Sequence, residues 1–407
     1  MTNHDRIGVD LSDPSTYIDG APHETFTRLR EDDPVHWQDV PGGTGYWAVL
    51  RHADVVTVAR HPEVFSASLG GVILEDLAPD QLEMMRHMLL AMDPPVHDEH
   101  RQPLAPSFSA RVIGAMEDRI RSICGDILGG LVDGGEIDFV HDVAAHLPTQ
   151  VVGELMGLPR DDWAQIHTWS AQQTSGQDPE VAGDVDADGA MNASISMAMY
   201  GIELAGARRG EPPRDDLTSL ILATEVGGEP ISDIDFGSFF VQLVTAGNDT
   251  TTTMLSSGTL ALIENPDQMA ALRTDRGLVP SAVEEILRWA NPLHYFRRTA
   301  TIDTELGGTT IGAGEKVAMI YTSANRDERV FARSQEFDIT RSPNPHLSFG
   351  IGAHFCLGAH LARLEGRVFF EELLAAFDVI ELVGEPRRVR SNLNNGLKAL
   401  PLRVASR

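Results

Sequence analysis

One ten-residue segment near the C-terminus constrains this chain more than any other. It reads Phe349-Gly350-Ile351-Gly352-Ala353-His354-Phe355-Cys356-Leu357-Gly358. Glycines let a backbone pass close to a large ligand, and a helix expected over residues 357–364 offers N–H groups and dipole charge that favour an ionised sulfur. The layout therefore predicts a thiolate presented to a flat iron macrocycle. A cysteine buried as a small hydrophobe is the alternative for Cys356 taken alone.

All fixed positions of the pattern Phe-Gly-x-Gly-x-His-x-Cys-x-Gly are present, so the chain resembles a bacterial cytochrome P-450 from about Pro34 to its C-terminus. The resemblance implies a mainly α fold with small β-sheets and heme b between a long central helix and the cysteine loop. Cys356 would be the proximal iron ligand, and thiolate ligation favours O–O cleavage. The other heme contacts implied in this segment are Phe349, Gly350, His354 and Gly358.

Composition agrees with a single large core. The chain has 407 residues, of which 42% are hydrophobic and 23% are charged, and length alone would suggest two or three domains. No linker, repeat or charge block divides it, and residues 176–189 and 211–214 are interpreted as surface loops. We expect one domain over residues 1–407, with residues 1–20 as an extended N-terminal segment.

Charge and cysteine content exclude several classes of protein. A net charge of −28 argues against a nucleic-acid-binding surface. Two cysteines, Cys124 and Cys356, cannot form a disulfide framework and lack zinc-site spacing. The N-terminus has no signal-peptide pattern, and no stretch approaches the roughly 20 apolar residues of a membrane span. We expect a cytoplasmic monomer that binds neither nucleic acid nor membrane.

Helical patterns dominate the order of elements. Apolar spacing predicts helices over residues 111–131 and 143–156, and another from Ser281 to the Asn291-Pro292 stop. The longest helix should begin after an N-cap at Ser232 and end at Glu264. Strands are expected at residues 46–50 and in a group over residues 295–319, where glycines punctuate β-type runs.

A polar cluster interrupts the longest predicted helix. It is Ala246-Gly247-Asn248-Asp249-Thr250, and its glycine and hydroxyl residues favour a local distortion, although a polar face of a long helix is the alternative. In the family that it resembles, this segment covers the distal face of the heme. The resemblance implies that Ala246 and Gly247 contact heme, that Thr250 hydrogen-bonds the reduced oxygen species and that Asp249 relays protons.

The heme carboxylates need cations. Residues 93–101 resemble the family segment Asp-Pro-Pro-x-His-x-x-x-Arg, which implies propionate contacts from His97 and Arg101, joined by Arg298 and His354. Arg297 is adjacent and could exchange roles with Arg298, because a one-residue slip reverses the side of a strand. A metal site at His97 and His100 lacks a third ligand.

A Glu-x-x-Arg pair, Glu285 and Arg288, lies on the helix after Ser281. Three-residue spacing alone is typical of a surface ion pair. The resemblance implies instead a buried structural network that includes Arg341 and holds the loop before the cysteine.

The chain has no phosphate loop, nucleophile elbow, zinc motif or dinucleotide fingerprint, so electrons must come from another protein. The resemblance implies a [2Fe–2S] ferredoxin and an NAD(P)H-dependent ferredoxin reductase. The leading hypothesis is a heme-thiolate monooxygenase that inserts one atom of O2 into an apolar substrate. The alternatives are a peroxide-driven peroxygenase and a non-catalytic heme-thiolate sensor. Neither would need Asp249 and Thr250, so the presence of this pair disfavours both.

Substrate specificity is predicted only as a class. The chain resembles actinobacterial relatives that act on sterols, terpenoids and branched lipids. Apolar residues in the expected pocket predict a hydrophobic molecule, although several of them could be ordinary core. The candidate pocket residues are Val72, Leu74, Met88, Leu89, Val244, Leu293 and Phe296.

Overall fold

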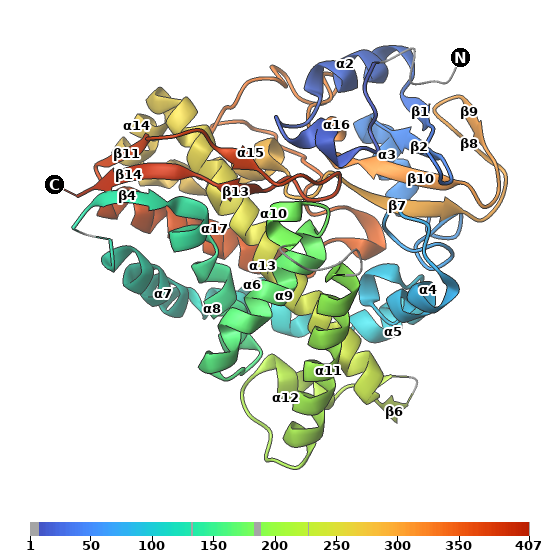
Figure 1. Ribbon diagram of the computed structural model, residues 1–407, viewed down its shortest axis with the longest axis horizontal. Coiled ribbons are helices and arrows are strands. Elements are labelled where there is room, and N and C mark those ends of the chain that lie inside the picture. Colours follow the sequence, from blue (N-terminus) through green and yellow to red (C-terminus); the bar gives the residue numbers. More distant parts are fainter. Residues whose placement is uncertain (1–7, 132, 183–188, 227, 407) are drawn as a thin grey trace.

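The long helix predicted from Ser232 organises the molecule. In this computed structural model, which describes residues 8–131, 133–182, 189–226 and 228–406, α13 spans Asp233–Glu264. The Ser232 hydroxyl accepts a hydrogen bond from the Asp235 amide at 3.0 Å and so caps the helix. Asn265 ends α13, and α14 (Pro266–Thr274) follows at an angle. Both predicted ends of the helix are confirmed, and Figure 1 shows α13 crossing the molecule diagonally.

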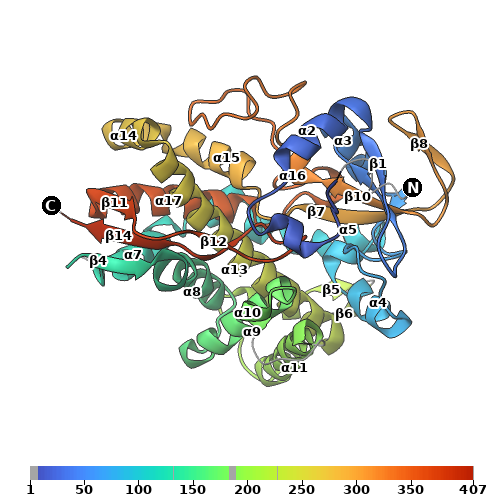
Figure 2. The same cartoon turned by 45° about the horizontal axis from the view of Figure 1, so that its top comes forward.

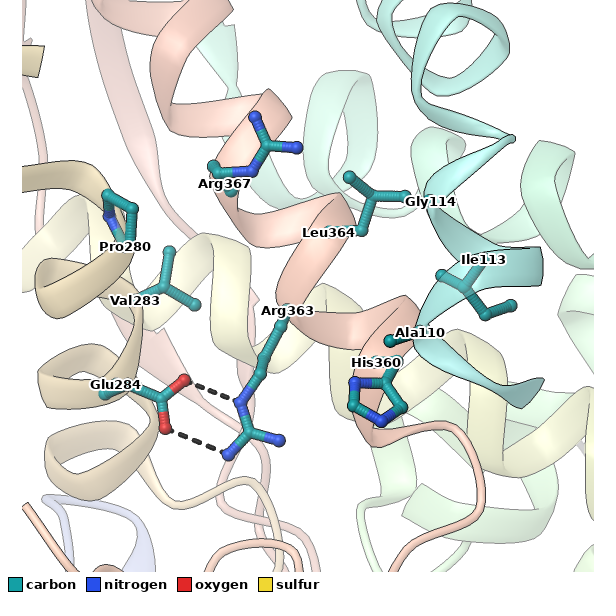
Figure 3. Close-up of a pocket in the computed structure, with 10 residues that line it drawn as sticks. All are labelled: Ala110, Ile113, Gly114, Pro280, Val283, Glu284, His360, Arg363, Leu364 and Arg367. Carbon is teal, nitrogen blue, oxygen red and sulfur yellow. Dashed lines mark hydrogen bonds and ion pairs between the residues drawn. The ribbon is translucent and has the colours of Figure 1, made fainter. Parts of the chain in front are cut away.

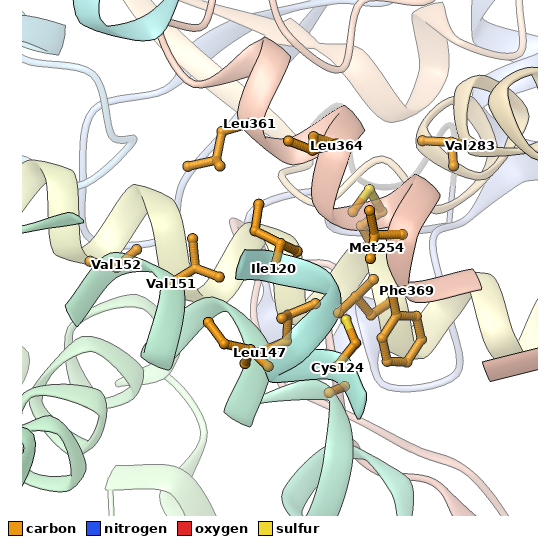
Figure 4. Packing of buried hydrophobic residues seen from close by; sticks show 14 of the residues in the cluster. Ile120, Cys124, Leu147, Val151, Val152, Met254, Val283, Leu361, Leu364 and Phe369 are labelled. Atoms are coloured by element: carbon orange, nitrogen blue, oxygen red, sulfur yellow. The ribbon is translucent and has the colours of Figure 1, made fainter. Parts of the chain in front are cut away.

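Helices from several distant parts of the chain pack directly against α13. They are α8 (His146–Leu155), α9 (Trp163–Ser175), α11 (Gly189–Arg209), α15 (Val279–Ala290) and α17 (Ala359–Ala376). A side chain at Gly258 would lie 2.6 Å from Ile286 of α15 and 2.8 Å from Phe370 of α17, so this glycine allows the three helices to approach closely. Figure 4 shows how α7 (Glu117–Gly129) adds Ile120 and Cys124 to the same core.

The helix predicted over residues 111–131 is wrong as a single element. The structure has α6 (Ala110–Gly114) followed by α7, because the amides of Ala115 and Met116 bond three residues back and tighten the turn. Apolar periodicity continues through the break and therefore hides it. Likewise, a π-helical turn, Val140–Ala144, precedes α8 and includes the first two residues of the predicted 143–156 helix.

The predicted strands belong mainly to one five-stranded sheet. Its order is β1-β2-β10-β7-β3, with β2 and β10 parallel and the other pairs antiparallel. Its strands are β1 (Val35–Gln38), β2 (Tyr46–Val49), β3 (Phe65–Ser66), β7 (Tyr295–Ala300) and β10 (Lys316–Ile320). The hairpin β8 (Thr304–Leu306) and β9 (Thr309–Ile311) completes the predicted 295–319 group. Figure 2 shows the sheet at the end of the molecule opposite the C-terminus.

The remaining elements are short and cover the core. A second sheet has the order β11-β14-β4, and two hairpins, β5-β6 and β12-β13, lie apart from it. The remaining strands are β4 (Gly135–Asp138), β5 (Glu225–Val226), β6 (Glu229–Pro230), β11 (Val379–Leu382), β12 (Arg387–Arg388), β13 (Leu397–Ala399) and β14 (Pro401–Ala405). The remaining helices are α2 (His23–Asp32), α3 (His52–Arg60), α4 (Pro79–Arg86), α5 (Val96–Arg101), α10 (Pro179–Ala182), α12 (Leu217–Leu222) and α16 (Tyr321–Ala324).

Two further predictions concern chain segments that the structure describes in part. The predicted 176–189 loop contains α10, and its residues 183–188 lie outside the described residues. Of the predicted extended segment 1–20, residues 1–7 lie outside, and Pro14–Tyr17 forms a 3-10 helix. Across the described part of the chain, no helix has both the length and the apolar character needed to span a bilayer.

Candidate active site

The Cys356 loop is a tight structure anchored on α3. Gly350 and Gly352 have φ of 64° and 80°, which side chains other than glycine rarely adopt. A side chain at Gly352 would lie 2.6 Å from the Ala59 carbonyl oxygen, so the loop also needs glycine for its contact with α3. The Cys356 amide donates to the Phe349 carbonyl oxygen at 2.8 Å and closes the loop just before α17.

The two cysteines have different surroundings. Burial raises the pKa of the Cys124 thiol far above its usual range, and Cys124 lies on α7 within the large hydrophobic core. Burial also raises the pKa of Cys356, but the Gly358 N–H and the positive charges of Arg101 and Arg363 oppose it. Cys356 is therefore the cysteine whose surroundings favour a thiolate ligand.

Four basic side chains from distant parts of the sequence meet beside this loop. The rings of His97 on α5 and His354 in the loop lie 4.4 Å apart. Burial, and after it the positive charges of Arg298, His97 and Arg101, lowers the pKa of His354 far below its usual range. His97 contacts the Asp98 carboxylate through Nδ1 at 2.9 Å, and Arg101 donates to the Phe355 carbonyl oxygen at 2.6 Å.

This basic cluster fits a ligand with two carboxylates. The Nε2 atoms of His97 and His354 are buried without a hydrogen-bond partner among the described residues. Among those same residues, neither Arg101 nor Arg298 forms an ion pair with a carboxylate. Such groups are costly to bury unless an acceptor meets them, and the two propionates of heme would supply acceptors.

The structure separates the two candidate arginines of β7. Arg298 acts electrostatically on His97 and His354. Arg297 points the other way, because its guanidinium donates to the Ile73 carbonyl oxygen at 3.2 Å and to the Thr299 hydroxyl at 3.2 Å. The geometry supports Arg298 as the propionate contact and gives Arg297 the task of holding the segment around Ile73.

The polar cluster of α13 presents several faces. Ala246 is exposed, whereas Val244 and Asn248 on either side of it are buried. The Thr250 hydroxyl donates to the Ala246 carbonyl oxygen at 2.7 Å, and α13 remains one continuous helix here. Gly247 faces α8 instead, where a side chain would lie 2.5 Å from Val152. Gly247 therefore serves helix packing.

Asp249 contacts α9 through two hydroxyl groups that the sequence analysis did not single out. Its Oδ2 atom accepts hydrogen bonds from Thr174 at 2.5 Å and from Ser170 at 3.1 Å. Burial raises the pKa of Asp249 to about 6, and the two hydroxyls act in the opposite direction. The available signal was the polar stripe of His167, Ser170 and Thr174, which occupy one face of a helix by spacing.

The Glu-x-x-Arg pair is fully buried. The Glu285 carboxylate accepts hydrogen bonds from Arg288 at 2.7 and 2.8 Å, from Arg341 at 3.0 Å and from the Asp338 amide at 2.8 Å. Arg288 also donates to the carbonyl oxygens of Asn325 and Ser334, each at 2.9 Å. The network joins α15 to the long segment that leads to Cys356, and the surface-pair alternative does not apply.

The candidate pocket residues do not all lie together. Met88, Leu89 and Val244 belong to the large helical core that includes α13. Val72 and Phe296 pack with each other in a small cluster beside Ala91. Leu293 is half-buried and bridges to Asn394. Leu74 packs instead with Tyr46 and other residues against the five-stranded sheet, so it is placed as core.

Comparisons with known proteins agree with the site. A family model described as Cytochrome P450 matches residues 203–403. A steroid C26-monooxygenase of Mycolicibacterium smegmatis is 40% identical over 399 residues, which are 96% of this chain and 92% of the relative. A methyl-branched lipid omega-hydroxylase of Mycobacterium tuberculosis is 39% identical over 395 residues, covering 94% of this chain and 90% of the relative.

A solved structure agrees in the same way. A Mycobacterium marinum cytochrome P450 in complex with pseudoionone matches with a TM-score of 0.90 and 38% identity, covering 97% of this chain and 98% of that chain. The fold and the relatives define a heme-thiolate enzyme. The chain belongs to the cytochrome P450 family, and it is a monooxygenase that binds heme b through a cysteine thiolate.

Proposed function

We propose that this cytochrome P450 holds heme b through Cys356 and hydroxylates an apolar substrate of the sterol, terpenoid or branched-lipid class. One observation carries the assignment of the site. The glycine-shaped loop that presents Cys356 lies beside a cluster of four basic side chains, in which two buried histidine nitrogens lack partners. In a heme-thiolate site, the protein supplies a thiolate ligand to the iron and basic groups that hold the two carboxylates of heme b.

Each part of the site has a distinct task. Bound heme supplies the activation of dioxygen, by which one oxygen atom enters a C–H bond and the other leaves as water. His97, Arg101, Arg298 and His354 bind the propionates and fix the orientation of the ring. Thr250 offers its hydroxyl on the distal side, and Asp249 passes protons toward it. The Glu285 network holds the loop that carries Cys356.

Apolar residues support a hydrophobic substrate. Val72, Met88, Leu89, Val244, Leu293 and Phe296 remain the candidate contacts, and a pocket with few polar groups favours a molecule bound mainly by burial of apolar surface. The names of the relatives refer to a steroid and to a methyl-branched lipid, and the similar solved structure holds pseudoionone. We therefore expect hydroxylation on a branched aliphatic chain.

Electrons are proposed to come from a [2Fe–2S] ferredoxin that an NAD(P)H-dependent reductase reduces. A groove of about 350 Å³ lies between α6, α15 and α17, the helix that begins just after Cys356, and Figure 3 shows the residues that line it. His360, Arg363 and Arg367 contribute basic groups to it, although Arg363 pairs with Glu284 at 2.6 Å and Arg367 pairs with Glu117. Exposed Arg111 beside the groove adds positive charge for an acidic partner.

The assignment of the ligand is tested with two matched cysteine variants. The purified holoenzyme is reduced under carbon monoxide, and the position of its Soret band is recorded. Cys124→Ser should keep the red-shifted band of a thiolate complex, whereas Cys356→Ser should lose it because a hydroxyl does not ionise there. A red-shifted band that persists in Cys356→Ser would overturn the assignment.

The substrate class and the electron source are tested together. Steroids, terpenes, branched and linear fatty acids and polar macrolides are added to the ferric enzyme, and the change in spin state reports displacement of iron-bound water. Compounds that respond are then incubated with NADH, reductase and ferredoxin, or with hydrogen peroxide alone. We expect product only with the electron chain. Tight responses from polar compounds alone would contradict the proposed substrate class.

A further inference from the structure

The contact between Asp249 and α9 is unusual in its chemistry. Ser170 and Thr174 lie one turn apart on α9, and both donate to the same oxygen atom, Oδ2 of Asp249. Ser170 is fully buried, so its hydroxyl belongs to the interior of the α9–α13 interface. The same interface carries a second polar contact, in which Thr245 donates to Gln173. Two neighbouring hydroxyls on one carboxylate oxygen form a built contact within an interface that is otherwise helix packing.

No cation shares this carboxylate within the described part of the chain. The influences on the Asp249 pKa are burial first, then Thr174 and Ser170, and no charged group contributes. The titratable groups on the adjoining helices lie elsewhere: His167 contacts Thr149, Glu154 pairs with Arg119 on the surface, and Glu203 of α11 is exposed. His146 of α8 acts on His167 and does not act on Asp249. The hydroxyl pair therefore determines how this carboxylate is held.

We propose that Ser170 and Thr174 are positioning residues that act through Asp249 and set the pH range in which it delivers protons to the distal site. The proposal rests on the proposed proton-donating role of Asp249. Both hydroxyls stabilise the ionised carboxylate, because a carboxylate accepts hydrogen bonds more strongly than a neutral acid does. They also hold Oδ2 toward α9, while the chain connects Asp249 directly to Thr250.

The balance of burial against two hydroxyls explains the protonation of Asp249. Burial alone would favour the neutral acid and raise its pKa further, which would make the carboxyl group a weaker proton donor. With both hydroxyls present the pKa is about 6, so the group exchanges protons near neutral pH. Without them the ionised form loses its stabilisation, and the pKa rises further.

The proposal is tested by infrared titration of the ferric holoenzyme. The carbonyl band of protonated Asp249 is identified by its absence from Asp249→Asn, and its intensity is followed against pH. Thr174→Val and Ser170→Ala should each move the midpoint upward, by about one pH unit for a lost hydrogen bond to a charged group. The pH at which hydroxylated product per NADH declines should move upward with it. Thr174→Ser should restore the wild-type midpoint.

A matched control lies on the same helix. Thr168 is exposed on α9, and among the described residues its hydroxyl donates only to the Ala164 carbonyl oxygen, so Thr168→Val should leave both midpoints unchanged. An unchanged infrared midpoint in Thr174→Val and Ser170→Ala would overturn the positioning role even where the enzyme is a normal monooxygenase. If Asp249→Asn instead formed as much hydroxylated product per NADH as wild type, the proton-donating role on which the proposal rests would be wrong. The infrared midpoint tests the positioning role independently of that outcome.

Discussion

The imidazole rings of His97 and His354 lie 4.4 Å apart, and neither Nε2 atom has a hydrogen-bond partner among the described residues. One ring comes from α5 and the other from the loop that carries Cys356, so the contact joins two sides of the site. Burying two such nitrogens together is unfavourable unless an acceptor meets them. The propionates of bound heme would provide that acceptor, and this relationship leads to the first prediction.

His97→Phe and His354→Phe should each weaken heme binding. Each variant removes one donor to a carboxylate, and loss of a hydrogen bond to a charged group should speed heme release by roughly 10- to 100-fold. Heme transfer to excess apomyoglobin measures the rate. His100→Gln is the matched control, because His100 contacts the Val96 carbonyl oxygen at 2.9 Å and packs near Phe239. Equal effects at His97 and His100 would contradict the propionate assignment.

Thr250→Ala should uncouple oxygen reduction from hydroxylation. The variant removes a hydroxyl that we propose lies on the distal side of the heme, and it removes no apolar substrate contact, so substrate binding and heme reduction should continue. Product formed per NADH consumed should fall by roughly tenfold or more, with peroxide accounting for the difference. Thr252→Ala is the control on the same helix, since its hydroxyl donates to Asn248 on the side facing Ala144. A well-coupled Thr250→Ala would exclude the assigned role.

Glu285→Gln should destabilise the whole fold. The side chains of Glu285 and Arg288 are fully buried, and the variant leaves two arginines without their common carboxylate. Breaking one partner of a buried pair costs about 3–5 kcal/mol in the free energy of unfolding. Urea unfolding should be compared with Glu83→Gln, which breaks an exposed pair with Arg86 and should cost less than about 1 kcal/mol. Similar losses in both variants would refute the structural role.

The stability of the fold should also depend on Glu365 of α17. Burial raises its pKa from the usual value of about 4.5 to about 8, and its Oε2 atom has no hydrogen-bond partner among the described residues. Between these two pH values the folded chain holds a proton that the unfolded chain has lost. The free energy of unfolding should therefore fall as pH rises, by up to about 1.4 kcal/mol per pH unit from this group.

Glu365→Gln should remove that contribution. Urea unfolding at pH 5.5, 6.5 and 7.5 should give a flatter dependence than wild type. Glu381→Gln, at an exposed position of β11, should keep the wild-type slope. An unchanged slope in Glu365→Gln would mean that the carboxyl is already ionised in the folded protein.

Local signals predicted much of the fold and the glycine-rich loop around Cys356. Ser232 marked the start of α13 because a hydroxyl cap acts within four residues of itself, and the glycines around Cys356 marked a loop whose backbone only glycine adopts easily. The break between α6 and α7 was not predicted, because apolar spacing is the same on both sides of it. A helix boundary that depends on one tightened turn does not change the hydrophobic pattern and so cannot be predicted from it.

Contacts between distant segments were harder to predict. Ser170 and Thr174 are ordinary helix residues until α9 packs on α13 and brings them to Asp249. The sequence did not show which of Arg297 and Arg298 faces the propionate site. The face of the sheet on which each side chain lies depends on the register of β7 against β10, in which Arg298 opposes Val317. Gly247 shows the opposite case, since the family resemblance implied a heme contact, whereas close packing against Val152 of α8 already accounts for a glycine at this position.

Electron transfer should depend on Arg111 in a salt-sensitive way. Arg111 is exposed on α6 beside the groove near Cys356, and within the described residues it forms no ion pair with a carboxylate. Arg111→Glu should raise the ferredoxin concentration needed for half-maximal turnover by roughly tenfold at low ionic strength, because a charge at an interface acts mainly on association. The difference should shrink as added salt shortens the Debye length to about 8 Å.

Arg403→Glu on β14, where Arg403 pairs with Glu136 in the second sheet, is the control and should leave turnover unchanged. Equal losses in the two variants, or a loss in Arg111→Glu that salt does not reduce, would place the ferredoxin on another face.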